Sequence, residues 1–154
     1  MEAFITDFIR AVQKRIDKKK FDCTFLLHEA APNCYSDSEE LLYKVTKLPQ
    51  SVGLFYSYVK YLNILRPRSL ELLSLSTMYC IDDRYIVFSK IKDMEIIAFD
   101  LNSYNKIEDE FDIVCLSNKF VITKTFPSFI TNKVWAWIDR GRIVWEKELY
   151  VRGN

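Results

Sequence analysis

Apolar residues recur at helical spacing at the start of the chain and predict an amphipathic helix over residues 2–19, with charged side chains on its other face. The apolar stripe consists of Phe4, Ile5, Phe8, Ile9, Val12 and Ile16. This period is lost over residues 21–35, which end in an Ala-Pro-Asn sequence. We therefore expect a connector there.

Two further helices are predicted before the middle of the chain. Ser36 and Glu39 have capping-box spacing and predict a short helix through residue 45. Leu48-Pro49 then begins a second helix, since proline is tolerated in a first turn. Its expected core face is Val52, Phe55, Tyr56, Val59 and Leu62. Ser69 is expected to cap a brief turn or helix over residues 70–73.

The second half of the chain changes to a β pattern. Residues 85–88 and 95–99 are β-rich runs separated by the polar pair Lys92-Asp93, and residues 111–116 and 120–123 form a second pair around Ser117-Asn118. Asp and Asn tolerate left-handed backbone better than most residues, so they are expected to take the place of glycine in these turns.

A last helix is expected after Pro127, capped by Ser128 and ending near Gly141. Its inward residues would be Ile130, Val134, Trp137 and Ile138. Residues 143–151 fit either a closing strand or a terminal helix. The predicted fold is α+β, a single domain over residues 1–154 with N-terminal helices, a largely antiparallel sheet and a C-terminal helix.

The composition excludes several classes of function. The chain has three glycines, whereas about eleven would be average for its length. They lie far apart, which excludes the glycine-rich loops of P-loop and Rossmann nucleotide-binding proteins, and we expect no cofactor. The net charge of +1 has no basic excess and predicts no nucleic-acid partner. Short apolar runs and an N-terminus without a basic segment predict a cytoplasmic protein with no membrane partner.

Catalytic and metal sites have little support in the sequence. The four cysteines include no Cys-x-x-Cys pair and His28 is the single histidine, so we expect reduced thiols, no metal site and no catalytic residues. A Ser–His–Asp or Cys–His site would have to use His28. One alternative is a small metal-dependent hydrolase in which Asp100, at the end of a strand, pairs with Asp112 or Glu95.

Two charged segments stand out against the balanced total. The first helix ends in a basic run over residues 14–20, which complements the helix dipole. The acidic segment 108–112 is either a solvated loop or a surface that meets a basic partner. The candidate partner-binding residues are Asp100, Glu108, Asp109, Glu110 and Asp112.

The order of motifs resembles the SUKH superfamily of fungal cell-wall-synthesis regulators and bacterial toxin-immunity proteins. Leu48-Pro49 before the aromatic run 55–58 is similar to the leucine-proline helix of that family. The runs 85–88 and 96–101, the second ending in Phe-Asp-Leu, resemble its central strands, and residues 126–130 resemble its Ser-Phe element. Where family members often carry glycine, this chain has Asn63 and Lys92-Asp93.

This resemblance implies an α+β domain without catalysis that binds other proteins. The expected function is a non-enzymatic immunity-type protein that neutralises a toxin by direct association, with a basic toxin domain as partner. An intracellular regulatory scaffold of the cell-wall-regulator type is the alternative that the resemblance also implies.

Overall fold

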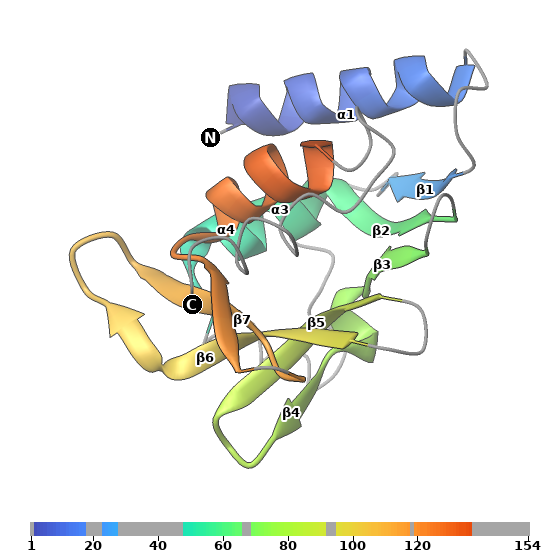
Figure 1. Ribbon diagram of the computed structural model, residues 1–154. Coiled ribbons are helices and arrows are strands. Elements are labelled where there is room, and N and C mark those ends of the chain that lie inside the picture. Colours follow the sequence, from blue (N-terminus) through green and yellow to red (C-terminus); the bar gives the residue numbers. More distant parts are fainter. Residues whose placement is uncertain are drawn as a thin grey trace.

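The computed structural model describes residues 2–17, 23–27, 48–65, 69–91, 95–117 and 119–136 (Figure 1). The helical elements are α1 (Glu2–Asp17), α3 (Gln50–Tyr58), the 3₁₀ turn η1 (Leu75–Thr77) and α4 (Phe126–Ser128), which continues into the π-helical segment η2 (Phe129–Val134). The strands are β1 (Cys23–Leu27), β2 (Val59–Ile64), β3 (Leu70–Leu72), β4 (Tyr79–Ile81), β5 (Tyr85–Ile91), β6 (Glu95–Asn105), β7 (Glu110–Cys115) and β8 (Phe120–Thr123).

The described strands form one antiparallel sheet in the order β1-β2-β3-β5-β6-β7-β8, and β4 pairs with the beginning of β5. Each strand along this path pairs antiparallel with its neighbour. The predicted α+β fold with a largely antiparallel sheet is confirmed.

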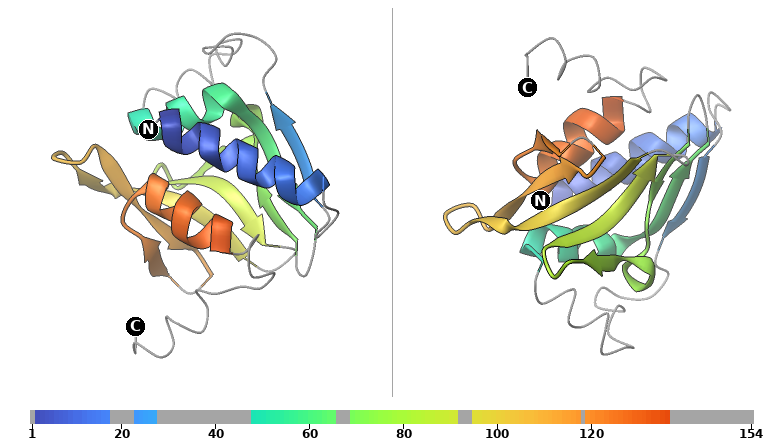
Figure 2. Two further views of the ribbon diagram at one scale, coloured as in Figure 1. Left: turned by 90° about the horizontal axis from the view of Figure 1, so that it is seen from above. Right: turned by 60° about the horizontal axis from the view of Figure 1, so that its bottom comes forward.

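One face of the curved sheet carries the helices: Figures 1 and 2 show α1 and α4 lying over the same side of the strands. An aromatic cluster joins the layers. Phe55 of α3 lies with its ring centroid 5.9 Å from that of Phe8 in α1 and 5.4 Å from that of Phe126 in α4. Phe126 in turn contacts Phe88 of β5 and Phe99 of β6, with ring centroids 5.9 and 5.8 Å away. This cluster defines the helix-covered face of the sheet.

The strongest sequence patterns predicted their elements correctly. The first helix, the helix after Leu48-Pro49 and the two strand pairs β5–β6 and β7–β8 all begin close to where they were expected. The first helix has a clear apolar period, and the strands are β-rich apolar runs bounded by polar turns, so local sequence specifies them.

Two expectations about the sheet's first half were wrong. Residues 23–27, expected within a connector, form β1, and the helix expected to reach Leu62 ends at Tyr58, where β2 begins. Val59 and Leu62 are buried as expected, but they lie on the strand. In both cases the deciding contact is distant in sequence, because β1 and β2 pair with each other from Cys23↔Ile64 to Leu27↔Val59.

Short elements account for the remaining differences. Residues 70–72 form β3 and not a turn or helix, and β4 was not predicted at all. The C-terminal helix is capped by Thr125, whose side chain accepts a hydrogen bond from the Ser128 amide, so the expected cap at Ser128 was wrong. Pro127 lies in the first turn, where no intrahelical amide bond is lost.

Several expectations fall outside the described residues. They are the helix over 36–45, His28, the end of the basic run at 18–20, the Lys92-Asp93 turn, Asn118, the inward Trp137 and Ile138, the helix end near Gly141, and the segment 143–151.

Aspartate takes the left-handed conformation in two described turns, although Asp93 and Asn118, where this was expected, lie outside the described residues. Asp82, Asp83 and Asp109 have φ angles of 54°, 53° and 53°, in the left-handed region that glycine usually fills. In the turn between β7 and β8 this conformation is taken by Lys119, with φ 59°. Among the described helices, none combines the length and apolar character needed to cross a membrane.

We predict that Phe126→Ala lowers the free energy of unfolding by about 3–5 kcal/mol, because it leaves a cavity between the helices and the sheet. Urea denaturation measures the change. Leu65→Ala is the control, since Leu65 is 45% exposed, and it should change stability by less than about 0.5 kcal/mol. Equal effects of the two substitutions would contradict the described core.

Candidate functional site

The hairpin formed by β6 and β7 projects beyond the rest of the sheet (Figures 1 and 2). Its ladder is interrupted between the pairs Asp100↔Asp112 and Asn105↔Glu110, so residues 101–104 stand opposite Phe111 alone. Ser103 closes this bulge: its hydroxyl donates to the Asp100 carbonyl at 2.6 Å and accepts from the Asp112 amide at 2.8 Å. A bulge of this kind bends a hairpin and redirects its end.

The turn at the end of the hairpin is held by its own side chains. The Asn105 side chain accepts hydrogen bonds from the amides of Ile107 and Glu108 at 2.9 and 3.2 Å. The Tyr104 hydroxyl donates to Asp109 Oδ1 at 2.7 Å, and this bond raises the pKa of Tyr104. These bonds fix the conformation of the turn.

Asp109 and Glu110 connect this turn to the helices. Asp109 Oδ2 accepts from the Gln50 amide at 3.1 Å, at the beginning of α3. Glu110 Oε2 accepts from the Ser51 hydroxyl at 2.6 Å, and its Oε1 accepts from the Phe126 amide at 2.8 Å, at the beginning of α4. First-turn amides lack intrahelical acceptors and carry the positive end of the helix dipole, so carboxylates satisfy them well.

The carboxylate of Glu110 is buried, with 6% of the residue exposed. Burial raises its pKa, and the negative charges of Asp109 and Glu108 add to this effect, while the bonds from Phe126 and Ser51 oppose it. The Glu110 side chain therefore belongs to the interior of the fold.

Of the other predicted partner-binding residues, Asp100 and Asp112 are paired with basic side chains and Glu108 is exposed. Asp100 receives two bonds from Arg84, at 2.9 Å from Nε and 3.1 Å from Nη2, and Asp112 lies 3.4 Å from Lys124 Nζ. The hydrogen bond from Arg84 lowers the pKa of Asp100. Of the five candidate partner-binding residues, Glu108 is the one that is largely exposed to solvent.

The alternative hydrolase site is brought together in part. Asp100 and Asp112 are cross-strand partners on the same face, as that hypothesis requires. Each carboxylate, however, is held by its own basic side chain. Within the described ranges, no group of three or more His, Cys, Asp and Glu side chains has an arrangement that could hold a metal ion.

The structure adds two residues that the sequence interpretation missed. Ile107 is 95% exposed at the end of the hairpin, and Tyr104 is 46% exposed beside it. An isoleucine between Lys106 and Glu108 in a polar turn was the available signal. We define the hairpin tip as residues 104–108, which combine an ordered backbone, exposed apolar surface and one exposed acid.

We predict that Glu110→Ala lowers the free energy of unfolding by about 1–3 kcal/mol, because the buried Phe126 amide loses its acceptor. Glu110→Gln keeps an acceptor for that amide and should be much less damaging. Urea titrations of both variants at neutral pH measure the difference. Similar losses in the two variants would contradict the proposed role of this bond.

Glu110 should also affect how the free energy of unfolding depends on pH. Its raised pKa means that the folded state holds the proton more tightly, so this residue's contribution to the free energy of unfolding falls as pH rises from 4.5 through the raised pKa. Glu110→Gln should therefore gain stability relative to the wild type across that window. A constant difference between the two proteins from pH 4 to 7 would be the contrary result.

Asp100 should change the pH dependence of the free energy of unfolding in the opposite direction to Glu110. Its lowered pKa gives stability that is present above the ordinary value of 3.8 and is lost as pH falls through the lowered pKa. Asp100→Asn should thus be less stable than the wild type at pH 7, with a difference that shrinks below pH 3.8. Asp7→Asn is the control, because the Asp7–Arg10 pair is largely exposed and contributes little.

Comparison of the chain with the profiles of known protein families, with curated proteins and with solved structures gives no match. The resemblance to the SUKH superfamily therefore stays a prediction.

Proposed function

We propose that this protein is a non-enzymatic binding module whose hairpin tip contacts another protein. The observation that supports it is the exposure of Ile107, at 95%, on a turn that is already fixed by hydrogen bonds. Covering this side chain with a partner would be favourable, because it removes apolar surface from water. Because the turn is ordered, little conformational entropy is lost on binding.

The tip also indicates the chemistry of the partner. Ile107 requires an apolar pocket, and Glu108 next to it favours a basic residue at the rim of that pocket. This is a narrower form of the acidic surface predicted from the sequence, since Asp109 and Glu110 are held by the helices. Its most concrete form is an immunity-type protein that occludes a basic toxin domain.

The regulatory-scaffold alternative uses the same surface and differs in the number and strength of its partners. An immunity protein has one tight partner, whereas a scaffold has several weak ones. The hydrolase alternative would need Asp100 and Asp112 to leave their bonds with Arg84 and Lys124.

We expect the wild-type chain to co-purify with the product of a neighbouring gene. Ile107→Asp should weaken that complex by about 30-fold or more, the scale of a hot-spot residue. Leu65→Asp, at an exposed aliphatic residue outside the tip, is the matched control. Titration calorimetry measures the dissociation constants, and circular dichroism verifies that each variant is folded. Failure to find any such complex would count against the immunity-type function.

Charge reversal tests the acidic part of the tip separately. Glu108→Lys should slow association and reduce its dependence on salt, because a steering charge is lost. Glu108 is the suitable position, since reversing Asp109 or Glu110 would break bonds to α3 and α4. Stopped-flow association rates of the wild type and the variant at several salt concentrations measure both effects. An unchanged rate would remove Glu108 from the contact.

A further inference from the structure

A single carboxylate links the hairpin tip to helix α3. Asp109 Oδ1 accepts a hydrogen bond from the Tyr104 hydroxyl at 2.7 Å, within the hairpin, and its Oδ2 accepts one from the Gln50 amide at 3.1 Å, at the first residue of α3. Ile107 and Glu108, the residues proposed to contact a partner, directly precede Asp109 along the chain. Their direction relative to the helices therefore depends on how Asp109 is held.

The backbone of Asp109 adopts a conformation for which its side chain is not needed. Its φ of 53° lies in the left-handed region, which glycine enters at the lowest cost. Asp83, in the turn between β4 and β5, has the same φ of 53°, but its side chain makes no hydrogen bond or ion pair with the described part of the chain. Asp83 is thus a matched reference for the backbone, and what Asp109 adds is its two side-chain bonds.

The bonds of Asp109 restrain the tip more than they stabilise the fold. Both lie at the surface, where water can replace a lost acceptor, whereas the Phe126 amide bonded to Glu110 is buried. Between the tip and the rest of the sheet, the ladder of β6 and β7 is interrupted over residues 101–104. The ladder alone therefore holds the tip weakly, and the carboxylates of Asp109 and Glu110 supply its attachments to the helices.

We propose that Asp109 is a positioning residue for recognition by the hairpin tip, an inference that rests on the proposed function of that tip. Asp109 itself does not contact the partner. Its carboxylate fixes the direction of Ile107 and Glu108 relative to α3, so the partner meets them in the conformation that it binds. Loss of this carboxylate lowers the affinity without removing a contact, because the freedom of a mobile tip is then lost on binding.

The first experiment needs no partner. Backbone ¹⁵N relaxation measures the motion of the Ile107 and Glu108 amides in the wild type, in Asp109→Gly and in Asp83→Gly. In Asp109→Gly we expect the order parameters of these two amides to fall from about 0.85, the value of a rigid backbone, toward about 0.6. Asp83→Gly should leave them unchanged. A tip that stays rigid in Asp109→Gly would overturn the proposal.

The second experiment measures affinity for the product of the neighbouring gene by titration calorimetry. Asp109→Gly should weaken binding by about five- to tenfold, the entropic cost of ordering a mobile segment, and Asp83→Gly should leave it unchanged. Asp109→Asn keeps an acceptor for the Gln50 amide and a polar group beside the Tyr104 hydroxyl, so it should recover most of the affinity. Equal effects of the two glycine substitutions would refute a role for the side chain.

Tyr104→Phe tests the end of this link that lies in the tip. It removes the hydroxyl but keeps the ring, whose centroid lies 5.0 Å from that of Phe111. Asp109→Gly should cost less affinity in the Tyr104→Phe background than in the wild type, because the two residues share one hydrogen bond. Fully additive losses would show that Asp109 does not act through Tyr104, against the proposal.

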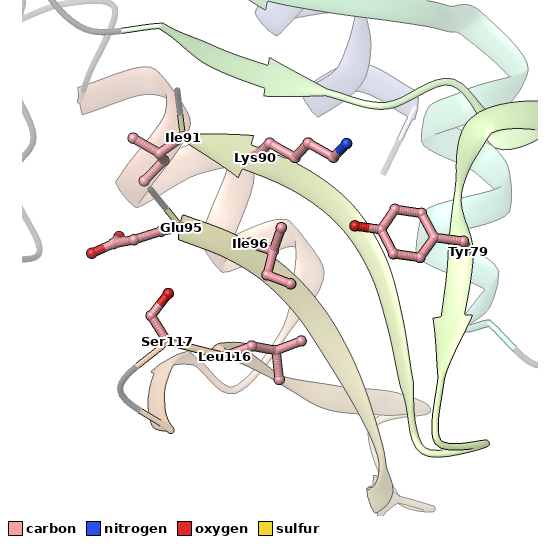
Figure 3. Close-up of a pocket in the computed structure, with 7 residues that line it drawn as sticks. All are labelled: Tyr79, Lys90, Ile91, Glu95, Ile96, Leu116 and Ser117. Atoms are coloured by element: carbon pink, nitrogen blue, oxygen red, sulfur yellow. The ribbon is translucent and has the colours of Figure 1, made fainter. Parts of the chain in front are cut away.

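A groove elsewhere on the sheet serves as the reference surface. It crosses β5, β6 and the end of β7 with a volume of about 500 Å³, and Figure 3 shows its Lys90 and Glu95 directed to opposite sides. None of the residues that line it belongs to the tip or bonds to Asp109. Lys90→Ala should therefore leave partner binding unchanged. A loss as large as that in Asp109→Gly would place the partner on the groove and overturn the proposal.

Urea denaturation separates positioning from a structural role. Asp109→Gly and Asp83→Gly should unfold at similar urea concentrations, since neither substitution removes a buried side chain. A much lower midpoint for Asp109→Gly would make Asp109 a structural residue and reject the positioning role. If no gene neighbour binds, the proposed immunity-type function fails, and the relaxation measurement still decides whether Asp109 fixes the tip.

Discussion

The arrangement of helices and sheet depends on two adjacent carboxylates. Asp109 and Glu110 join the end of the β6–β7 hairpin to the first amides of α3 and α4, elements that lie 59 and 16 residues away along the chain. Burying Glu110 is unfavourable, as its raised pKa shows, but its bonds to Phe126 and Ser51 offset part of that cost. The aromatic cluster of Phe55, Phe88, Phe99 and Phe126 packs between these same elements.

These bonds of Asp109 and Glu110 to the helices explain why the role of the acidic segment was only partly predicted from the sequence. Three consecutive acids look like a solvated surface, because their partners belong to other elements and have no local signature. The same limit applies to β1, since Cys23 pairs with Ile64. The strands β3 and β4 pair with segments close to them in sequence, but each has three residues, too few to show a pattern. By contrast, α1 has its own helical period, and the pairs β5–β6 and β7–β8 are β-rich apolar runs joined by polar turns, so they could be predicted.

The near-zero net charge reflects charges of both signs that lie close together in space. Lys106 and Glu108 are both exposed at the projecting tip, and on the sheet Lys90 stands opposite Glu71 in the ladder. Asp100 and Asp112 are likewise paired with Arg84 and Lys124. Apart from Glu108, the acids predicted to form a binding surface are therefore already engaged by groups of this chain.

The bulge in the β6–β7 hairpin has a consequence for how such a protein can vary. Because residues 101–104 leave the ladder, the register of the inner strands is set by Asp100↔Asp112 and the pairs before it, independently of the turn. Asn105, Asp109 and Glu110 anchor the outer end. The sequence of residues 106–108 can thus change while the core keeps the same structure, and under the proposed function such a change would alter which partner is bound.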